Sequence, residues 1–335
     1  MRITIKDIAR ESGFSIATVS KVLNNKDSEI SEPTKEIILK IADQLNYQTN
    51  RAARSLVSNS TKTIGLLLPD ISNPFFSDIA KGAEDFAYKK GYSIILCNSD
   101  DIIEKELDYL NTLIQLNVDG ILLVGNKKHN NIKSTSLIFD QPIVSIDRES
   151  NYTNILSVIK TDHYNGAKEA MNYLIKNGHK KILFIGGQED TVPAIERFNA
   201  YKDSMETHKL KYNLNDIYFK DFSTEHGYNT ILKIKNIKKY SAIFCCNDLI
   251  AIGAMAALKD IGLNIPNDIS LIGVDDIELS KISSPPLTTM KQSAYKLGSK
   301  SCEILLKKLN NNIEITNITL TQKLVVRKSV KKIKT

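Results

Sequence analysis

The sequence predicts a small all-α domain followed by an α/β core of two lobes built on parallel sheets. Three observations support this prediction. The first 48 or so residues form short amphipathic helical patterns with capping residues and no strand-like alternation. From residue 63 on, short apolar runs alternate with amphipathic stretches, and a second series of the same kind starts after residue 162. The 335 residues also exceed what one hydrophobic core usually organises.

These patterns divide the chain into three segments. We expect the helical domain over residues 1–48, a short helix with a linker over 49–61, and the core over 62–335. Within the core, lobe 1 is expected over about 62–161 and 291–321, and lobe 2 over about 162–290 and 322–335. The chain should cross between the lobes near residues 160–163, 288–292 and 320–324, with 287–290 as a strand that returns to the first lobe.

The composition is that of an ordinary globular protein with a mild basic excess. The net charge of +7 suits a polyanionic partner without requiring one. No apolar stretch approaches the roughly 20 residues that cross a bilayer, and the N-terminus lacks a signal-peptide pattern. We therefore expect a cytoplasmic protein with no membrane contact. Its four cysteines show no CxxC spacing, so we expect buried reduced thiols, with no metal and no cofactor.

Three short helices are predicted in the first domain. Thr4 can cap the first helix and Gly13 can end it, while Ser15 can cap a second helix over Ile16–Leu23. A third helix should begin near Ser31 and run to about residue 45. The residues expected to face inward are Val19, Val22 and Leu23 on the second helix and Ile37, Ile38, Ile41 and Leu45 on the third.

The outward face of the second helix has an unusual composition. Its residues are small, hydroxylic, amide or basic, which lets a helix enter a DNA major groove and make hydrogen bonds there. An ordinary solvated face more often carries glutamates, although any small helical bundle remains the alternative. The residues of this face are Ile16, Ala17, Thr18, Ser20, Lys21 and Asn24.

Residues 3–25 resemble the helix-turn-helix of the LacI/GalR repressor family, most clearly in Asp7-Ile8-Ala9, Gly13 and the run from Ala17 to Asn24. The resemblance implies a transcription regulator whose partner is double-stranded operator DNA. Bases would be contacted by Ile16, Ala17 and Lys21, and phosphates by Thr4, Ser15, Thr18, Ser20 and Asn24. Because Ile16 can make only apolar contacts, such as with a thymine methyl, the preferred operator should differ from that of members with a polar residue there.

The following segment, Leu45 to Leu56, resembles the hinge helix of the same family. The resemblance implies that Leu56 wedges into the minor groove with Ala53 beside it, while Asn50 and Arg54 also contact DNA. Thr49 replaces the usual proline before Asn50. An eight-residue helix is marginal alone in water, so it should form only when two subunits bind DNA together. A plain linker helix is the alternative.

Polar and aromatic residues follow the apolar runs of the core. Open parallel sheets bind ligands at the carboxyl ends of their strands. Planar donors and acceptors beside phenylalanines suit a small polyol, because the charged groups bond hydroxyls and the rings cover C–H faces. Each such residue alone is more simply a loop or cap residue. The segments are 73–76, 147–148, 196–197, 247–248, 275–276 and 292.

The core, from Thr63 to about Arg327, resembles the type I periplasmic-binding-protein fold of this family. Its candidate contacts are most like those of ribose-binding relatives, which favours ribose or another pentose, although several also occur in members that bind other sugars. Phe198 stands near Arg197 where a glycine is common. The candidate set is Asn73, Phe75, Phe76, Asp147, Arg148, Arg197, Phe222, Asn247, Asp275 and Gln292.

The sequence thus favours a repressor of carbohydrate genes under allosteric control by a small sugar. A purine, a phosphosugar or a phosphoprotein corepressor remains an alternative effector, and a free-standing sugar-binding protein an alternative class. An enzyme is disfavoured, because no GxGxxG, GxxxxGK[ST], HExxH or GxSxG motif is present. No leucine heptads end the chain, so a homodimer is expected rather than a tetramer.

Overall fold

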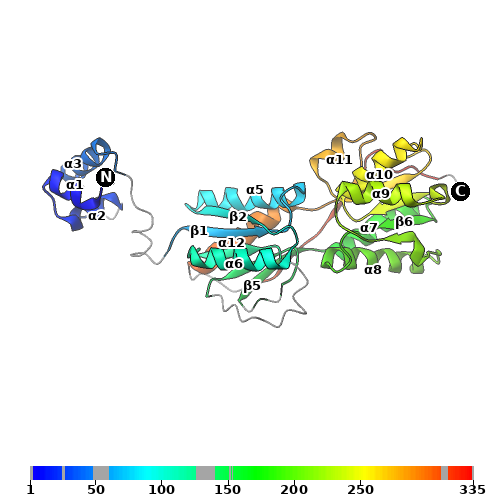
Figure 1. The fold of residues 1–335 in the computed structure, drawn as a ribbon, viewed down its shortest axis with the longest axis horizontal. Helices are drawn as coiled ribbons and strands as arrows, with labels where there is room; N and C mark the ends of the chain where they lie inside the picture. The colour runs from blue at the N-terminus through cyan, green and yellow to red at the C-terminus, as the bar shows by residue number, and fades with distance from the viewer. Residues whose placement is uncertain are drawn as a thin grey trace. The chain divides into compact units, whose positions relative to one another are not determined.

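The computed structural model describes residues 3–24, 27–47, 60–125, 140–150, 152, 154–310 and 316–333 (Figure 1). The chain separates into two compact units, residues 1–61 and 62–335. The predicted hinge contacts Asn50, Ala53, Arg54 and Leu56 lie outside the described residues. Within the described part of the chain, no helix is both long and apolar enough to cross a membrane.

The first unit contains the three predicted helices, α1 (Ile5–Ser12), α2 (Ile16–Leu23) and α3 (Glu32–Gln44). At the start of α1, the backbone N–H of Thr4 donates to the Asp7 carboxylate over 2.9 Å. Gly13 ends the helix at φ 71°, a left-handed conformation that glycine adopts without strain. The buried residues of this unit are Ile8, Ala9, Val19, Val22, Ile38 and Ala42.

One expected core residue of this unit is exposed. Ile37 leaves 45% of its surface accessible, whereas its neighbour Ile38 is fully buried. Successive residues of an α-helix point about 100° apart, so the stripe that runs through Ile38, Ile41 and Ala42 turns Ile37 away from the core. The expectation that Ile37 faces inward was therefore wrong.

The first lobe of the second unit is a six-stranded parallel sheet in the order β11-β5-β4-β3-β1-β2. Helices α5 (Pro74–Lys89) and α12 (Ala294–Leu309) pack with one side of the sheet, and α6 (Ile103–Gln115) packs with the other. The strands are β1 (Thr63–Leu68), β2 (Ser93–Asn98), β3 (Gly120–Leu123), β4 (Ile143–Ile146), β5 (Ile155–Thr161) and β11 (Ile318–Leu320).

The second lobe is also six-stranded, in the order β12-β10-β9-β8-β6-β7, and only β12 runs antiparallel to its neighbour. Its strands are β6 (Ile182–Ile185), β7 (Ile217–Tyr218), β8 (Ala242–Cys245), β9 (Ser270–Asp275), β10 (Thr288–Lys291) and β12 (Lys323–Val325). Its helices are α7 (His163–Lys176), α8 (Val192–Thr207), α9 (Thr224–Lys233), α10 (Asp248–Asp260) and α11 (Glu278–Ile282).

The strand near residues 287–290 does not return to the first lobe. β10 pairs in parallel with β9, in the register Thr288 with Ile272 and Met290 with Val274. The first three residues of β10 are buried, so this strand completes the second sheet. The crossover follows only after Lys291, because α12 is the next element and packs in the first lobe.

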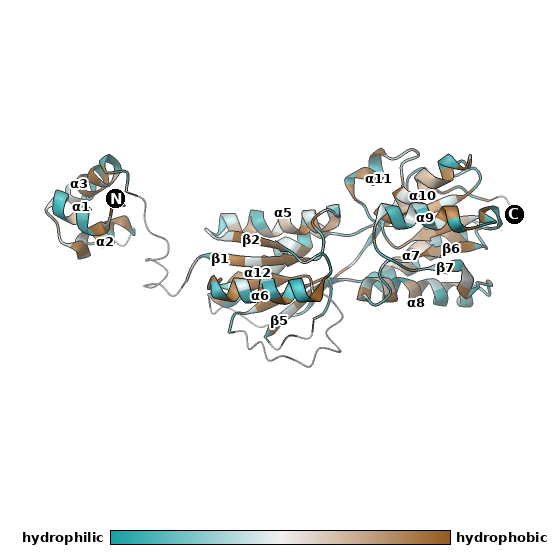
Figure 2. Cartoon of the chain, viewed as in Figure 1, coloured by the Kyte–Doolittle hydropathy of each residue, from teal (hydrophilic) through white to brown (hydrophobic). Residues whose placement is uncertain are grey.

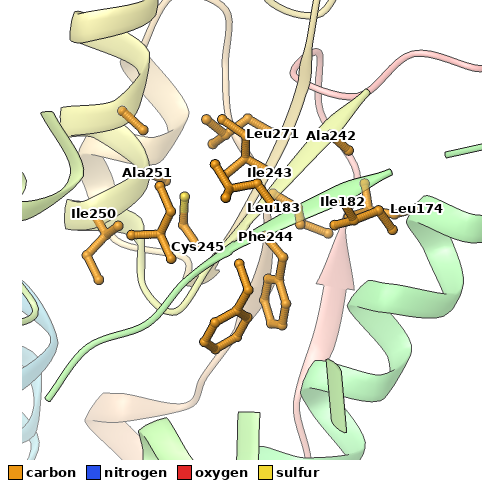
Figure 3. Close-up of a cluster of buried hydrophobic side chains, with 14 of the residues drawn as sticks. Leu174, Ile182, Leu183, Ala242, Ile243, Phe244, Cys245, Ile250, Ala251 and Leu271 are labelled. Carbon is orange, nitrogen blue, oxygen red and sulfur yellow. The ribbon is translucent and has the colours of Figure 1, made fainter. Parts of the chain in front are cut away.

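The apolar residues gather on the strands and on the inward faces of the helices, while the outer helix faces are hydrophilic (Figure 2). In the second lobe, Leu183, Ile243 and Leu271 lie side by side on adjacent strands, and Leu174 of α7 lies against Ile182 (Figure 3). All four cysteines are free and buried, as predicted. Each lobe therefore has its own dense core.

Glycines let pairs of helices cross in close contact. A Cβ atom on Gly298 of α12 would lie 1.9 Å from the carbonyl oxygen of Ile79 in α5. A Cβ atom on Gly82 of α5 would lie 2.0 Å from the carbonyl oxygen of Tyr295 in α12. Both clashes are with backbone atoms, which cannot swing away as a side chain does. The two helices of the first lobe are therefore fixed together at these two positions.

Replacing Gly298 with alanine should lower the free energy of unfolding of the core by about 1–3 kcal/mol, the usual cost of overpacking. Chemical denaturation measures this change. The control is Lys296→Ala on the exposed side of the same helix, which should stay within about 0.5 kcal/mol of wild type. Equal stability of the two variants would contradict the close crossing.

Candidate functional site

Two cavities lie where the carboxyl ends of the two sheets meet. The inner one, called the chamber here, has a volume of about 30 Å³. The structure brings all ten predicted ligand contacts to it, five from the first lobe, four from the second and Gln292 from a crossover. The lining residues are Asn73, Phe75, Phe76, Asp147 and Arg148 from the first lobe, Pro193, Arg197, Phe222, Asn247 and Asp275 from the second, and Gln292 from the crossover after β10.

Two asparagines in the chamber wall also begin helices. The Asn73 side chain accepts a hydrogen bond from the backbone N–H of Phe75 over 3.0 Å at the start of α5. Asn247 accepts from the backbone N–H of Ile250 over 2.9 Å at the start of α10, and its Nδ2 donates to the carbonyl of Phe222 over 3.0 Å. The caps fix both amides, and Asn247 also fixes the loop that carries Phe222.

Two buried arginines supply the positive charge of the chamber. Arg148 pairs through Nη1 with Asp101 at 2.5 Å, and its guanidinium lies 5.7 Å from the centre of the Phe76 ring. Arg197 donates through Nη1 to the carbonyl of Cys246 over 2.7 Å. The Nε atoms of both arginines are buried and have no hydrogen-bond partner, so each retains a donor for a bound molecule.

Two buried aspartates supply the negative charge. Burial raises the pKa of Asp275 to about 7, although Arg197 and the hydrogen bond from Gln292 oppose part of this rise. Burial also acts to raise the pKa of Asp147, but His163 and both arginines beside it bring this pKa below its ordinary value. At neutral pH, Asp147 is therefore ionised and Asp275 is close to its midpoint.

The backbone at these aspartates is unusual as well. Asp147 has φ 61° and Asp275 has φ 122°, and the following Asp276 has φ 62°. Such positive values are uncommon for residues other than glycine, and they cluster at sites that bind ligands. The turns after β4 and β9 thus hold the Asp147 and Asp275 carboxylates at the chamber, and the strained backbone there costs some stability.

Three other strand-end residues named from the sequence do not line either cavity. Asp248 is buried and accepts hydrogen bonds from the Thr289 hydroxyl over 2.6 Å and from the backbone N–H of Ile277 over 3.1 Å. Asp276 forms an ion pair with Arg327, and Glu196 lies outside both cavities. Asp248 and Asp276 are therefore engaged by partners within the second lobe and are not available to the cavities.

The outer cavity, called the mouth here, is an open cleft of about 1170 Å³ that shares Asn73, Phe76, Arg148 and Phe222 with the chamber. Its lining is rich in acids and includes only two cations, Arg148 and Lys220. The acidic residues are Asp70, Asp100, Asp101, Glu189, Asp190 and Asp221. Sequence reasoning missed this set, although most of its members directly follow β1, β2, β6 and β7 and could have been found by that position.

The predicted DNA-contacting face of α2 is accessible in the first unit. Ile16 leaves 47% of its surface exposed, and Ala17 and Lys21 are exposed beside it. The hydroxyls of Ser15 and Thr18 lie 2.9 Å apart, and Asn24 donates through Nδ2 to the carbonyl of Ser20 over 2.8 Å. Of the candidate phosphate contacts, Ser15 and Asn24 thus cap the two ends of α2 and Thr18 and Ser20 lie within it, while the candidate base contacts lie along its exposed side.

Two sequence profiles match different parts of the chain. Residues 4–50 match bacterial regulatory proteins of the lacI family, and residues 171–330 match the periplasmic binding protein-like domain. The chain is 37% identical over 332 residues to the HTH-type transcriptional regulator RegA of Clostridium saccharobutylicum, covering 98% of this chain and 99% of RegA. The HTH-type transcriptional repressor PurR of Haemophilus influenzae is 36% identical over 336 residues, with the same coverage.

The chain belongs to the LacI family. It is a DNA-binding transcriptional regulator with an effector-binding domain, in a family that is not enzymatic. The predicted family and fold class are thereby confirmed. Among the residues that the structure describes, no group of three or more His, Cys, Asp or Glu side chains could hold a metal ion.

Solved structures of LacI-family proteins match all or most of this chain. The Lac repressor dimer bound to operator and the anti-inducer ONPF has a TM-score of 0.87 at 25% identity, covering 99% of this regulator and 100% of that chain. A LacI family transcriptional regulator from Enterococcus faecium with bound ribose has a TM-score of 0.70 at 27% identity, covering 81% and 100% respectively.

The raised pKa of Asp275 predicts a pH effect on the stability of this LacI-family regulator. Because the pKa of about 7 in the folded protein lies above the ordinary value of 3.8, the protonated carboxyl contributes stability that is complete below about pH 4 and lost as the pH rises through 7. The Asp275→Asn variant keeps the shape without the titration. Its free energy of unfolding should therefore rise relative to wild type between about pH 5 and pH 8, as measured by urea denaturation.

The matched control is Asp78→Asn, which removes an exposed carboxylate on α5 that lines neither cavity. Its stability relative to wild type should show no such drift with pH. A constant offset between Asp275→Asn and wild type at every pH would contradict the burial of an ionisable Asp275.

Proposed function

We propose that this regulator is a homodimeric repressor of carbohydrate-metabolism genes and that its effector is a small neutral sugar, with ribose or another pentose favoured. The observation that carries this proposal is the chamber, where two carboxylates, two guanidiniums and three amides surround a space flanked by three phenylalanines. Acting on operator DNA places the protein in the cytoplasm.

The chamber chemistry suits a polyol on all sides. A buried donor or acceptor that has no partner costs about 1–3 kcal/mol. The Nε atoms of Arg148 and Arg197 and the Oε1 of Gln292 are in that position. Sugar hydroxyls both donate and accept, so one molecule can satisfy them together with Asp147 and Asp275. The phenylalanine rings then cover the apolar C–H faces of the sugar ring.

The charges favour an uncharged effector over a phosphosugar. The two chamber arginines face an ionised Asp147 and an Asp275 that is about half-ionised at neutral pH, and Arg148 also pairs with Asp101, so no net positive charge remains for a phosphate. The mouth adds six carboxylates against Arg148 and Lys220, and this excess repels an approaching anion. The phosphosugar alternative is therefore disfavoured.

A purine is the second candidate, because PurR proteins are among the relatives of similar identity. A purine presents its donors and acceptors only along its edge. Side chains above and below the ring would then remain unpaired, and the charged groups in this chamber come from both lobes. The ribose-bound Enterococcus faecium regulator and the Alkaliphilus metalliredigens protein complexed with D-xylulofuranose support the pentose instead.

Effector binding can change the lobe angle. The chamber of about 30 Å³ is smaller than a sugar and shares four lining residues with the mouth, so a bound sugar would widen the chamber or extend into the mouth. The lobes are joined by crossovers after β5, β10 and β11, which can act as hinges. We infer that the sugar enters an opened form and then selects a lobe angle that differs from that of the empty protein.

The same motion of the lobes can couple sugar binding to DNA binding. The similarity to the Lac repressor dimer on its operator supports two recognition helices, one from each subunit, in successive major grooves. The hinge segment, with Asn50, Ala53, Arg54 and Leu56, would then occupy the central minor groove. A change in lobe angle alters hinge pairing, and linkage requires DNA to change sugar affinity by the same factor.

Calorimetric titration of the full-length protein with ribose, other pentoses, hexoses, ribose 5-phosphate and purines tests the effector. We expect ribose or another free pentose to bind. The Arg197→Ala substitution should weaken this binding by roughly 10- to 100-fold, because a hydrogen bond to a charged group contributes about 1.5–3 kcal/mol. Lys202→Ala, which removes a cation on the same helix that lines neither cavity, is the control. Binding of a purine without any sugar would reject the proposed effector.

Operator duplexes selected from a random pool by the wild-type protein test the DNA contacts. Replacing Lys21 with alanine should weaken binding to the selected operator by roughly tenfold or more, because a base-edge contact is worth about 1–3 kcal/mol. Lys40→Ala, an exposed lysine on α3, should change operator affinity much less, and both variants should keep wild-type sugar affinity. Equal losses in the two variants would argue against base contact by Lys21.

A further inference from the structure

His163 is a completely buried side chain at the junction of the lobes, and the proposed function does not yet use it. It is the first residue of α7, two residues after β5 ends at Thr161, so it follows the first crossover directly. It lines neither the chamber nor the mouth. Its ring nonetheless lies between two side chains that do line the chamber.

Both ring nitrogens face charged partners. Nδ1 lies 3.2 Å from Nη2 of Arg197, and Nε2 lies 3.1 Å from Oδ1 of Asp147. A guanidinium has only N–H donors, so Nδ1 must be the acceptor in the first contact and carry no hydrogen. The single proton of the neutral imidazole is then on Nε2, which lies within ion-pair distance of the Asp147 carboxylate without forming a hydrogen bond to it. The two neighbours thus select one tautomer.

The contact with Asp147 joins the two lobes. Asp147 follows β4 of the first lobe, whereas His163 and Arg197 belong to α7 and α8 of the second. Arg197 is held at its other terminal nitrogen by the carbonyl of Cys246, and Asp147 sits on a backbone with φ 61°. The His163 ring therefore orients the Asp147 carboxylate of the first lobe and the Arg197 guanidinium of the second lobe together.

We propose that His163 is a positioning residue for the effector: its neutral imidazole, protonated on Nε2, couples Asp147 to Arg197 and aligns both for one bound molecule. This inference rests on the proposed effector site. His163 itself does not touch the effector. It orients a carboxylate that accepts from ligand hydroxyls and a guanidinium whose free Nε donates to them, which is the arrangement that a polyol with neighbouring hydroxyls requires.

The tautomer can be read in the full-length protein without any sugar. The chain contains five histidines, so a protein labelled with ¹⁵N only at histidine gives few side-chain signals, and His163→Asn identifies the one that belongs to residue 163. We expect the pattern of a neutral ring with its proton on Nε2. A proton on Nδ1, or on both nitrogens at neutral pH, would overturn the proposed coupling.

Sugar affinity provides the second measurement. His163→Leu, which keeps bulk but removes both nitrogens, should weaken the binding of the sugar selected by the calorimetric panel by tenfold or more. His163→Gln, which can still reach Asp147 with a donor, should recover part of that loss. Affinity of the sugar-free variants for the selected operator should stay at the wild-type value.

The matched control is His179→Leu. His179 is also fully buried in the second lobe, but its Nε2 contacts the carbonyl of Lys331 in the C-terminal segment, away from the chamber. Loss of stability without loss of sugar affinity is expected for this variant. The same outcome for His163→Leu would overturn the positioning role and leave His163 with a structural one.

The two measurements separate failure of this inference from failure of the proposed function. If the wild type binds no free sugar, the proposed effector is rejected, and the affinity series is repeated with whichever compound of the panel binds. The ¹⁵N pattern decides the coupling of His163 to its neighbours in either case, because it needs no effector.

Discussion

Charge buried between the two lobes is the constraint on which the effector-binding unit depends. Asp147, Arg148, Arg197 and Asp275 are each at least 93% buried, and moving an ion from water into a protein costs several kcal/mol even after relaxation. The unit meets this cost with paired opposite charges, and Asp275 meets it by a raised pKa. Helix caps, strained turns and the position of His163 all hold these four charged side chains close to partners of opposite charge.

The lobes behind the charged groups are stiff, which makes their relative angle the variable that a ligand can change. Each lobe is a sheet of parallel strands, with only β12 antiparallel, covered by helices. Glycine-mediated crossings fix α5 against α12 in the first lobe and α9 against α10 in the second. Packed cores resist continuous deformation. In the mechanism we propose, a small rearrangement at the chamber therefore rotates whole lobes, and the crossovers absorb this rotation.

In the effector site that we propose, selectivity is divided between the two cavities. The chamber offers charged groups of both signs and aromatic faces, which suit the shape and hydroxyl pattern of a neutral sugar. The acidic mouth acts earlier, on molecules that approach, and disfavours anions whatever their shape. Asp101 connects the two cavities, because it lines the mouth and also pairs with Arg148 of the chamber.

The sequence by itself determined whatever depends on near neighbours in the chain. Thr4, Gly13 and Ser15 mark helix ends through contacts within three or four residues, and the apolar runs that became β1, β6 and β9 show their burial in their own composition. The ten chamber residues were found because polar and aromatic side chains follow such runs and because they resemble a known contact set. Long periodic elements and strand ends are local features, so a single sequence carries them.

Only the tertiary structure decided the features that join distant residues. The place of β10 in the second sheet depends on its register with β9, and the exposure of Ile37 depends on the packing of three helices. The contacts of Asp101 with Arg148, and of His163 with Asp147 and Arg197, span 16 to 47 positions of the chain. No local pattern encodes such pairs. They arise when the folded sheets bring their carboxyl ends together, and the same burial sets the pKa of Asp275.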